Sequence, residues 1–265
     1  MALSPKEVHE LKSFATKIRL NTLETLNHLG FGHYGGSLSV VEVLAVLYGK
    51  VMNMAPEQFK KKDRDYFVLS KGHAGPALYS TLYLKGFFDK DFLHSLNTNG
   101  TRLPSHPDRN LIAYGQIIND SPHFTYTIVG DGELNEGQCW EAIQFAAHHK
   151  LRNLLVFVDD NKKQLDGTTE EVCNPGDFVE KFKAFGFETI RVDGSDIKEI
   201  YDAIIELQSS TSNQPKCIVL DTVKGQGVPE LETMTANHHL RPSDEQRAML
   251  EKAVFDLRKR LEDMV

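Results

Sequence analysis

Two polar turns that contain metal-binding residue types each follow a short apolar run. The first turn is Gly130-Asp131-Gly132-Glu133, and the second, "DDNKKQLDG", begins at Asp159 and contains Asn161. One helix and one strand fit between the two turns, so we expect Asp131 and Asn161 on the ends of neighbouring strands. Their side chains are a carboxylate and a carboxamide, and both offer oxygen atoms to a hard cation.

Such a pair suits Mg2+ that holds a diphosphate. Glycines beside Asp131 let the backbone approach phosphate groups, and a helix N-terminus after the turn favours negative charge. Gly-Asp-Gly alone is also ordinary turn chemistry, and the alternative is two unrelated turns. The position of Asn161 after the next strand favours one shared site.

Four histidines occur in glycine-rich or proline-flanked turns. His33 lies in "FGHYGGS", His73 in "SKGHAGPAL", His106 in "LPSHPD" and His238 in "TMTANHHL". Imidazoles titrate near neutral pH and can both donate and accept protons, so a group of them suits proton transfer. Any one of the four, taken alone, is better explained as an ordinary surface or core residue.

Helices are expected between the turns. The capping box at Ser4 and the apolar spacing after it predict a helix to about Gly30, and Ser37 is expected to cap a second helix. Later helices are predicted over 136–149 and 196–209, and a terminal helix after a second capping box at Ser243 and Gln246.

Strands are expected at five short apolar or β-branched runs. These are Tyr66–Leu69, Phe124–Val129, Leu154–Val158, Glu188–Val192 and Cys217–Leu220. Their alternation with helices predicts an α/β fold, a three-layer doubly wound and mainly parallel sheet with helices on both faces. Ligands bind such sheets outside the carboxyl ends of the strands, where both polar turns fall. We treat residues 1–265 as a single domain.

The composition excludes several classes of protein. The chain has 265 residues, 40% hydrophobic and 25% charged, which is typical of a globular domain. A net charge of −7 argues against a nucleic-acid-binding surface, and no apolar run reaches the roughly 20 residues that span a membrane. The N-terminus lacks the pattern of a secretion signal. Cys139, Cys173 and Cys217 lack CxxC spacing, so we expect reduced thiols in a cytoplasmic protein.

Together these motifs resemble the N-terminal, diphosphate-binding part of transketolase, from about residue 10 to 245. The likeness rests on "FGHYGGS", "SKGHAGPALYSTLYLKG", "LPSHPD", "GDGELNEGQCWEA", "DDNKKQLDG" and "TVKGQGVPELETMTANHHLRPSDEQ". It implies a thiamine-diphosphate-binding fold that transfers a two-carbon ketol unit from a ketose phosphate to an aldose phosphate, using thiamine diphosphate and Mg2+. The thiazolium carbon attacks a carbonyl, and the cofactor then accepts electrons during carbon–carbon cleavage.

The resemblance also implies roles for individual residues. Asp131 and Asn161 would bind Mg2+ through their side chains, and Lys163 through its backbone carbonyl. Gly130, Gly132 and Glu133 would line the diphosphate side. His73 and His238 would hydrogen-bond the diphosphate and face the reacting centre, while His33 and His106 would hold substrate hydroxyls. Cys139 and Trp140 are assigned to the packed face of a helix, without chemistry.

The chain departs from the family in two ways. Whole transketolases continue into a pyrimidine-binding domain, which we expect this protein to lack. We therefore expect the first subunit of a split transketolase, with a second, pyrimidine-binding subunit and a pair of such heterodimers, a heterotetramer. The family also has a glycine-rich cofactor segment after the "HPD" loop, and here the chain passes almost directly to the next strand. We expect an omitted loop, with a break in the chain near Leu111 to Ala113.

Two other interpretations stay open. One is a thiamine-diphosphate enzyme with other substrates, such as a synthase or an oxo-acid dehydrogenase component. The other is a non-catalytic regulatory subunit that kept the fold and lost part of the cofactor pocket.

Overall fold

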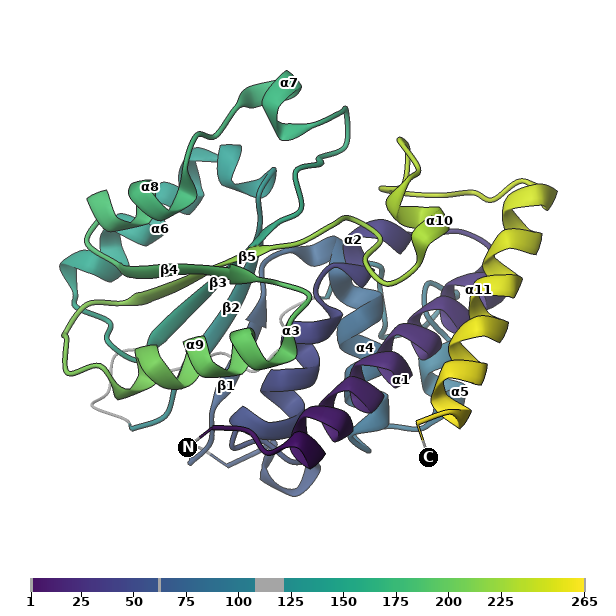
Figure 1. The fold of residues 1–265 in the computed structure, drawn as a ribbon, viewed down its shortest axis with the longest axis horizontal. Coiled ribbons are helices and arrows are strands. Elements are labelled where there is room, and N and C mark those ends of the chain that lie inside the picture. Colours follow the sequence, from purple (N-terminus) through teal and green to yellow (C-terminus); the bar gives the residue numbers. More distant parts are fainter. Residues whose placement is uncertain (1, 62, 108–121, 265) are drawn as a thin grey trace.

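The computed structural model describes residues 2–61, 63–107 and 122–264, and these are built around one twisted sheet (Figure 1). Its strands follow the spatial order β1-β2-β3-β5-β4, and every neighbouring pair is parallel. The strands are β1 (Tyr66–Leu69), β2 (Thr125–Gly130), β3 (Leu154–Asp160), β4 (Glu188–Asp193) and β5 (Lys216–Asp221). All five predicted strands are confirmed. The expected chain break at Leu111 to Ala113 lies outside the described residues.

The helices form a layer on each face of the sheet. Figure 1 shows α6 and α8 on one side, and α9 with α1 and α3 on the other. Two separate groups of buried apolar residues fill the two interfaces. The helices are α1 (Pro5–Leu29), α2 (Tyr34–Leu38), α3 (Val41–Val46), α4 (Gly75–Leu84), α5 (Lys90–His94), α6 (Gly137–His148), α7 (Thr169–Cys173), α8 (Phe178–Ala184), α9 (Ile197–Ser209), α10 (Pro229–Glu232) and α11 (Asp244–Glu262). The predicted doubly wound three-layer fold is confirmed.

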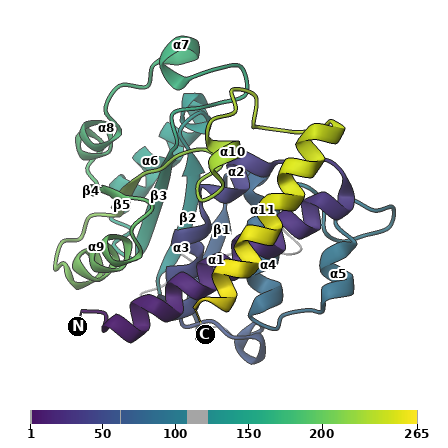
Figure 2. The ribbon, with the colours of Figure 1, turned by 45° about the vertical axis from the view of Figure 1, so that its right-hand side comes forward.

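Both long N- and C-terminal helices begin at the predicted capping boxes. The Ser4 hydroxyl accepts from the Glu7 amide at 3.3 Å, and the Glu7 carboxylate accepts from the Ser4 amide at 2.8 Å. Ser243 and Gln246 make the same reciprocal pair at the start of α11. These caps satisfy amides that have no partner within the helix. Figure 2 shows α11 lying along α1. Among the described helices, none is long and apolar enough to cross a membrane.

The prediction that Ser37 caps the second helix is wrong. Ser37 lies inside α2, and its hydroxyl donates to the His33 carbonyl at 2.7 Å. The helix begins earlier, at Tyr34, and the Ser37 hydroxyl is engaged with a carbonyl of the preceding turn. At Gly35 the backbone lies against the neighbouring loop, where the Gly35 amide donates to the Asn237 carbonyl at 3.0 Å. His33 therefore stands at the start of α2, and the chain turns again before α3.

The register brings the strand ends together. Gly130 at the end of β2 lies opposite Asp159 of β3, and Asp160 lies opposite Asp221 of β5. Since all strands run the same way, the loops that follow β1, β2, β3 and β5 meet at one edge of the sheet. This edge carries the polar turns found in the sequence.

Candidate functional site

A cleft of about 520 Å3 opens at the carboxyl edge of the sheet. Side chains and backbone from the loops after β1, β2, β3 and β5 line it. The residues predicted from the sequence that line it are His73, His106, Gly130, Asp131, Gly132, Glu133, Asn161, Lys163 and His238. His33 does not line this cleft directly, but its ring contacts the rings of three histidines that do. The structure therefore brings the whole predicted set together.

Asp131 and Asn161 lie on adjacent strand ends, as expected. Asp131 accepts from its own turn at the Gly132 amide, at 2.8 Å, and from the Lys162 amide beside Asn161, at 2.6 Å. Asp131 is 2% exposed and Asn161 4%. Burial, followed by the charge of Asp159, raises the pKa of Asp131 to about 6. A bound cation would stabilise the charged form of this carboxylate.

The carbonyl of Lys163, the third predicted metal ligand, also faces this region. It accepts from the Lys224 ammonium at 3.1 Å, and the Lys163 ammonium itself turns away to the Met234 carbonyl at 3.1 Å. A carbonyl oxygen has a second lone pair, so the contact with Lys224 leaves one free for another partner. The residue type at position 163 does not decide whether its carbonyl can bind.

The acidic turn after β2 is tightly organised by Glu133. One Glu133 oxygen accepts from the Ser70 hydroxyl, and the other from the Gly130 amide at 3.0 Å. Glu133 therefore holds its own turn against the loop after β1 while lining the cleft. At Gly132 a Cβ atom would lie 2.7 Å from the Gln164 Cβ, so only glycine fits there. The 3-10 turn Glu133–Asn135 connects the acidic turn to α6, which begins at Gly137, within one residue of the predicted start.

The four predicted histidines form one cluster centred on His33. The ring centroid of His33 lies 5.3 Å from that of His106, 5.5 Å from His238 and 5.8 Å from His73. The rings of His73 and His238 are 4.6 Å apart. His239 adds a fifth imidazole, 4.8 Å from His33. The sequence showed His239 beside His238 but gave it no role.

Close packing of the cluster depends on a glycine. A Cβ atom at Gly36 would overlap the imidazole of His73, so α2 can lie against this ring only with glycine at that position. His73 is held from the other side by the short 3-10 turn Gly72–Ala74 that follows β1. The glycine-rich turn of the sequence thus serves to bring two histidines together.

The surroundings favour the neutral form of His33, His73 and His238. Burial, followed by the nearby imidazoles of His239 and His106, lowers the pKa of His33 to about 4. Burial and then Lys224 lower the pKa of His238 to about 3, and burial and then Lys71 lower the pKa of His73 well below its usual value. Neutral imidazoles can each donate and accept a proton at pH 7.

Lys224 also selects a tautomer of His238. Its ammonium lies 2.9 Å from His238 Nδ1, and an ammonium can only donate. Nδ1 is therefore the acceptor, and the proton of neutral His238 is on Nε2. Burial, followed by the charge of Lys71, lowers the pKa of Lys224 to about 8.

Sequence analysis gave no role to three residues that line the cleft, Lys71, Gln164 and Lys224, or to Asp159, which lies behind it. Lys71 is 2% exposed and Lys224 1%, whereas lysines are almost always exposed unless they are paired. Burial alone would raise the pKa of Asp159, but the ammonium of Lys71 holds it below its usual value. The available signal was that Lys71 and Lys224 lie two and three residues after strand ends, in the motifs "SKGHAGPAL" and "TVKGQG".

Two buried polar atoms of the site have no hydrogen-bond partner among the described residues. They are His33 Nδ1 and Gln164 Nε2. Buried polar groups are nearly always paired, so such atoms favour a site built for a polar ligand. The Gln164 amide, with the oxygen atoms of Asp131 and Asn161 and the ammonium of Lys224, fits a magnesium diphosphate group.

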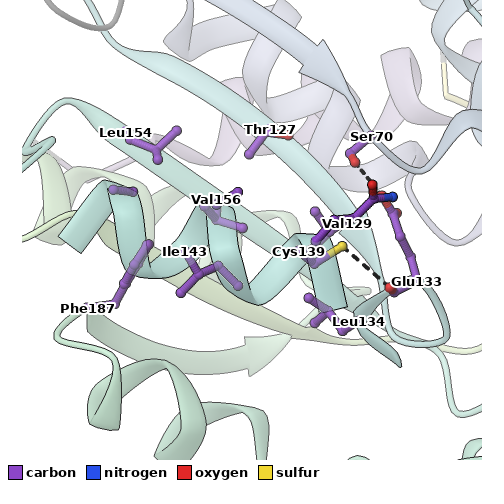
Figure 3. A pocket seen from close by; sticks show the side chains of 13 residues that line it. Ser70, Thr127, Val129, Glu133, Leu134, Cys139, Ile143, Leu154, Val156 and Phe187 are labelled. Atoms are coloured by element: carbon purple, nitrogen blue, oxygen red, sulfur yellow. Dashed lines mark hydrogen bonds between the residues drawn. The ribbon is translucent and has the colours of Figure 1, made fainter. Parts of the chain in front are cut away.

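A second, apolar cavity of about 360 Å3 lies between α6 and the sheet (Figure 3). Figure 3 shows Ile143, Leu154, Val156 and Phe187 around it, with the Ser70–Glu133 hydrogen bond at one end. Cys139 lines it, and burial followed by the charge of Glu133 raises the pKa of this thiol to about 11. The thiol stays protonated at neutral pH, so the polar cleft is the better candidate for chemistry.

Trp140 packs on the neighbouring face of α6. Its ring contacts those of Phe182 and Phe185, and its Nε1 donates to the Leu134 carbonyl at 2.7 Å. The assignment of this helix face to packing is confirmed.

Comparison with protein families gives one clear match. The family described as transketolase, thiamine diphosphate binding domain, matches residues 11–118 and 113–260. Two relatives are similar over nearly their whole length. A 6-deoxy-6-sulfo-D-fructose transketolase subunit from Clostridium sp. (strain MSTE9) is 40% identical, over 94% of this chain and 97% of that protein. An apulose-4-phosphate transketolase subunit from Phocaeicola vulgatus is 31% identical, over 97% of each.

Longer transketolases are similar over part of their length. Human transketolase is 29% identical over 88% of this chain and 40% of that protein. A crystal structure of a transketolase variant from Pichia stipitis has a TM-score of 0.79 and 26% identity, over 97% of this chain and 45% of that one. The chain thus spans less than half the length of these transketolases.

Proposed function

Because this chain belongs to the transketolase family, we propose that it binds thiamine diphosphate with Mg2+ and transfers a two-carbon ketol unit from a ketose to an aldose. One observation carries the proposal. Asp131 and Asn161 meet on adjacent strand ends, and the predicted histidines gather over the same cleft. The family match also confirms the resemblance inferred from the sequence.

The donor set divides into two parts. Asp131, Asn161 and the Lys163 carbonyl supply the hard oxygen atoms that Mg2+ prefers. The Lys224 ammonium and the Gln164 amide, which lie beside them, would hold diphosphate oxygens. The turn Gly130–Gly132 would let the diphosphate approach the backbone.

The histidines would handle protons on the substrate. Thiamine diphosphate, when bound, supplies a nucleophilic carbon and accepts electrons during carbon–carbon cleavage. His73 and His238 would contact the diphosphate and face the reacting centre, and the Nε2 proton of His238 is available as a donor there. His33 and His106 would hold hydroxyl groups of the sugar. A neutral imidazole can donate to an alkoxide or accept from a hydroxyl.

We propose that the ketose carries an anionic group at its far end. The two relatives of matching length are named for a sulfonated fructose and for a sugar phosphate. A sugar phosphate is therefore the first substrate to test, with the sulfonated sugar beside it.

We also propose that a second, pyrimidine-binding subunit completes the site, in a cytoplasmic heterotetramer. The two relatives that match over 97% of their length are both named as subunits. Relatives named simply transketolase or transketolase-like are more than twice as long. This chain, treated as a single domain, would supply the diphosphate half of the pocket.

The experiment is a coupled assay over ketose and aldose pairs, with the chain alone and mixed with its partner subunit. The chain alone should bind the cofactor weakly and show no turnover, and the mixture should be active. His106→Ala should raise the KM for the ketose, while His94→Ala, in α5 and away from the cleft, should not. A mixture that binds the cofactor without turnover would favour a regulatory subunit. Turnover of oxo acids but not sugars would favour the other enzyme class.

A further inference from the structure

A buried carboxylate, Asp159, lies behind the proposed cation site. It is 0% exposed, stands at the end of β3 and does not line the cleft. It accepts hydrogen bonds from Ser39 Oγ at 2.8 Å, from Asn161 Nδ2 at 2.8 Å, from Thr222 Oγ1 at 2.5 Å and from the ammonium of Lys71. Three of these donors reach Oδ2 and one reaches Oδ1, so both carboxylate oxygens are held by neighbouring side chains.

The four donors come from four separate segments. Ser39 lies between α2 and α3, Lys71 follows β1, Thr222 follows β5, and Asn161 follows β3 itself. Lys71 supplies the opposite charge that a buried carboxylate needs. Three strand ends and a helix junction therefore converge on Asp159.

This contact decides which way the Asn161 carboxamide points. A carboxylate only accepts, so the NH2 end of the carboxamide must face Asp159, and the oxygen must face the other way. Asn161 Oδ1 accordingly lies near the Lys163 amide, which donates to it at 3.1 Å, in the loop that lines the cleft. With the opposite orientation, the amide oxygen would meet the carboxylate and the NH2 group would meet the Lys163 N–H.

We propose that Asp159 is the positioning residue of the cation site: it holds Asn161 with its amide oxygen toward the cation and its NH2 group away from it. The inference rests on the proposed function, because it assumes that Asn161 binds Mg2+. Substituting a residue that orients a metal ligand through a hydrogen bond typically lowers metal affinity by about 10- to 100-fold.

Exchanging the carboxylate of Asp159 and the carboxamide of Asn161 tests the proposal. In Asn161→Asp the new carboxylate would face Asp159, so Mg2+ affinity should fall about tenfold or more, although a carboxylate is intrinsically the better ligand for Mg2+. In the double variant Asp159→Asn with Asn161→Asp, the new amide at 159 can donate to the new carboxylate at 161. The double variant should therefore bind Mg2+ more tightly than Asn161→Asp alone.

Two variants control for stability. Ser39→Ala and Thr222→Val each remove one hydrogen bond to Asp159 without touching Asn161. Both should lower the melting temperature of the unliganded chain and leave Mg2+ affinity within about threefold, since the carboxamide keeps its anchor. A purely structural role would make affinity follow stability across all the variants.

The measurement uses the full chain, alone and mixed with the partner subunit. Titration calorimetry with thiamine diphosphate at several Mg2+ concentrations gives the affinity, and electron paramagnetic resonance of added Mn2+ gives direct metal binding. Equal or tighter binding by Asn161→Asp, or no recovery in the double variant, would overturn the proposal. If the unaltered protein shows no Mg2+-dependent binding, the proposed function itself fails, and this outcome is distinct from the first.

Discussion

Replacement of Asp131 by asparagine should separate stability from function. The side chain is 2% exposed, and burial followed by the charge of Asp159 raises its pKa from 3.8 to about 6. At about 1.4 kcal/mol per pH unit, the folded chain at pH 7 carries a penalty of about 3 kcal/mol for the ionised form. The unfolded chain loses this proton near pH 4 and the folded chain only near pH 6, so the stability of the folded chain falls as the pH rises from about 4 to 6.

Asp131→Asn removes this penalty, because asparagine carries no charge. The loss of hydrogen bonds opposes the resulting gain in stability. Both Asp131 oxygens accept from backbone amides, of Gly132 at 2.8 Å and of Lys162 at 2.6 Å. Asparagine has one oxygen, so one of these amides would meet an NH2 group, which costs about 1–3 kcal/mol. The unliganded variant should therefore be as stable as the unaltered chain, or up to about 2 kcal/mol more stable. In a chain of this size, 1 kcal/mol corresponds to about 2–4 °C in the melting temperature.

Cofactor binding should change in the opposite direction. Substituting a residue that only supports a metal ligand typically lowers metal affinity by roughly 10- to 100-fold. Asp131 would bind the cation itself, so Asp131→Asn should weaken Mg2+-dependent binding by more than this. Denaturant unfolding in EDTA gives the stability, and calorimetry with thiamine diphosphate and Mg2+ gives the affinity.

A matched control exists on the next strand. Asp160 is 5% exposed and does not line the cleft, and it accepts from Arg191 at 2.7 Å and from the Lys162 ammonium. Asp160→Asn should cost about 1–2 kcal/mol of stability, since it weakens a partly exposed ion pair, and should leave cofactor affinity nearly unchanged. A large loss of stability in Asp131→Asn, or its unchanged affinity for the cofactor, would refute the reasoning.

Three further outcomes can be checked. Lys224→Met should weaken diphosphate binding about tenfold by calorimetry. It should also raise the pKa of His238 in an NMR titration, because burial and then the Lys224 ammonium lower that pKa in the unaltered chain. Gly36→Ala should displace the ring of His73, lowering kcat/KM at least about tenfold with the partner present, and unchanged kinetics would contradict the packing argument. His33 should titrate near pH 4 by NMR, because burial and then the neighbouring imidazoles depress its pKa. In the unfolded chain His33 takes up a proton near pH 6.5. The contribution of neutral, buried His33 to the stability of the fold is therefore complete above that pH and is lost as the pH falls toward 4.

Much of the site followed from the order of elements in the sequence. One helix and one strand separate Asp131 from Asn161, and consecutive βαβ strands usually lie side by side, so the sequence alone was enough to place the two residues together. β2 and β3 are indeed neighbours. The histidines are different. No periodicity relates His33 to His73 or His238, and only the resemblance to a family joined them.

The buried pair of Lys71 and Asp159 could not have been found in this way. Its formation depends on the strand order, in which β3 lies between β2 and β5, so that the loops after β1 and β5 both reach the end of β3. Periodicity gives the existence of strands but not their order across the sheet, and a lysine after a strand is normally exposed. The residues that would touch the ligand thus lie in local motifs, and Asp159 stands in the same motif as Asn161. The other side chains that fix Asp159, those of Ser39, Lys71 and Thr222, come from distant segments of the chain.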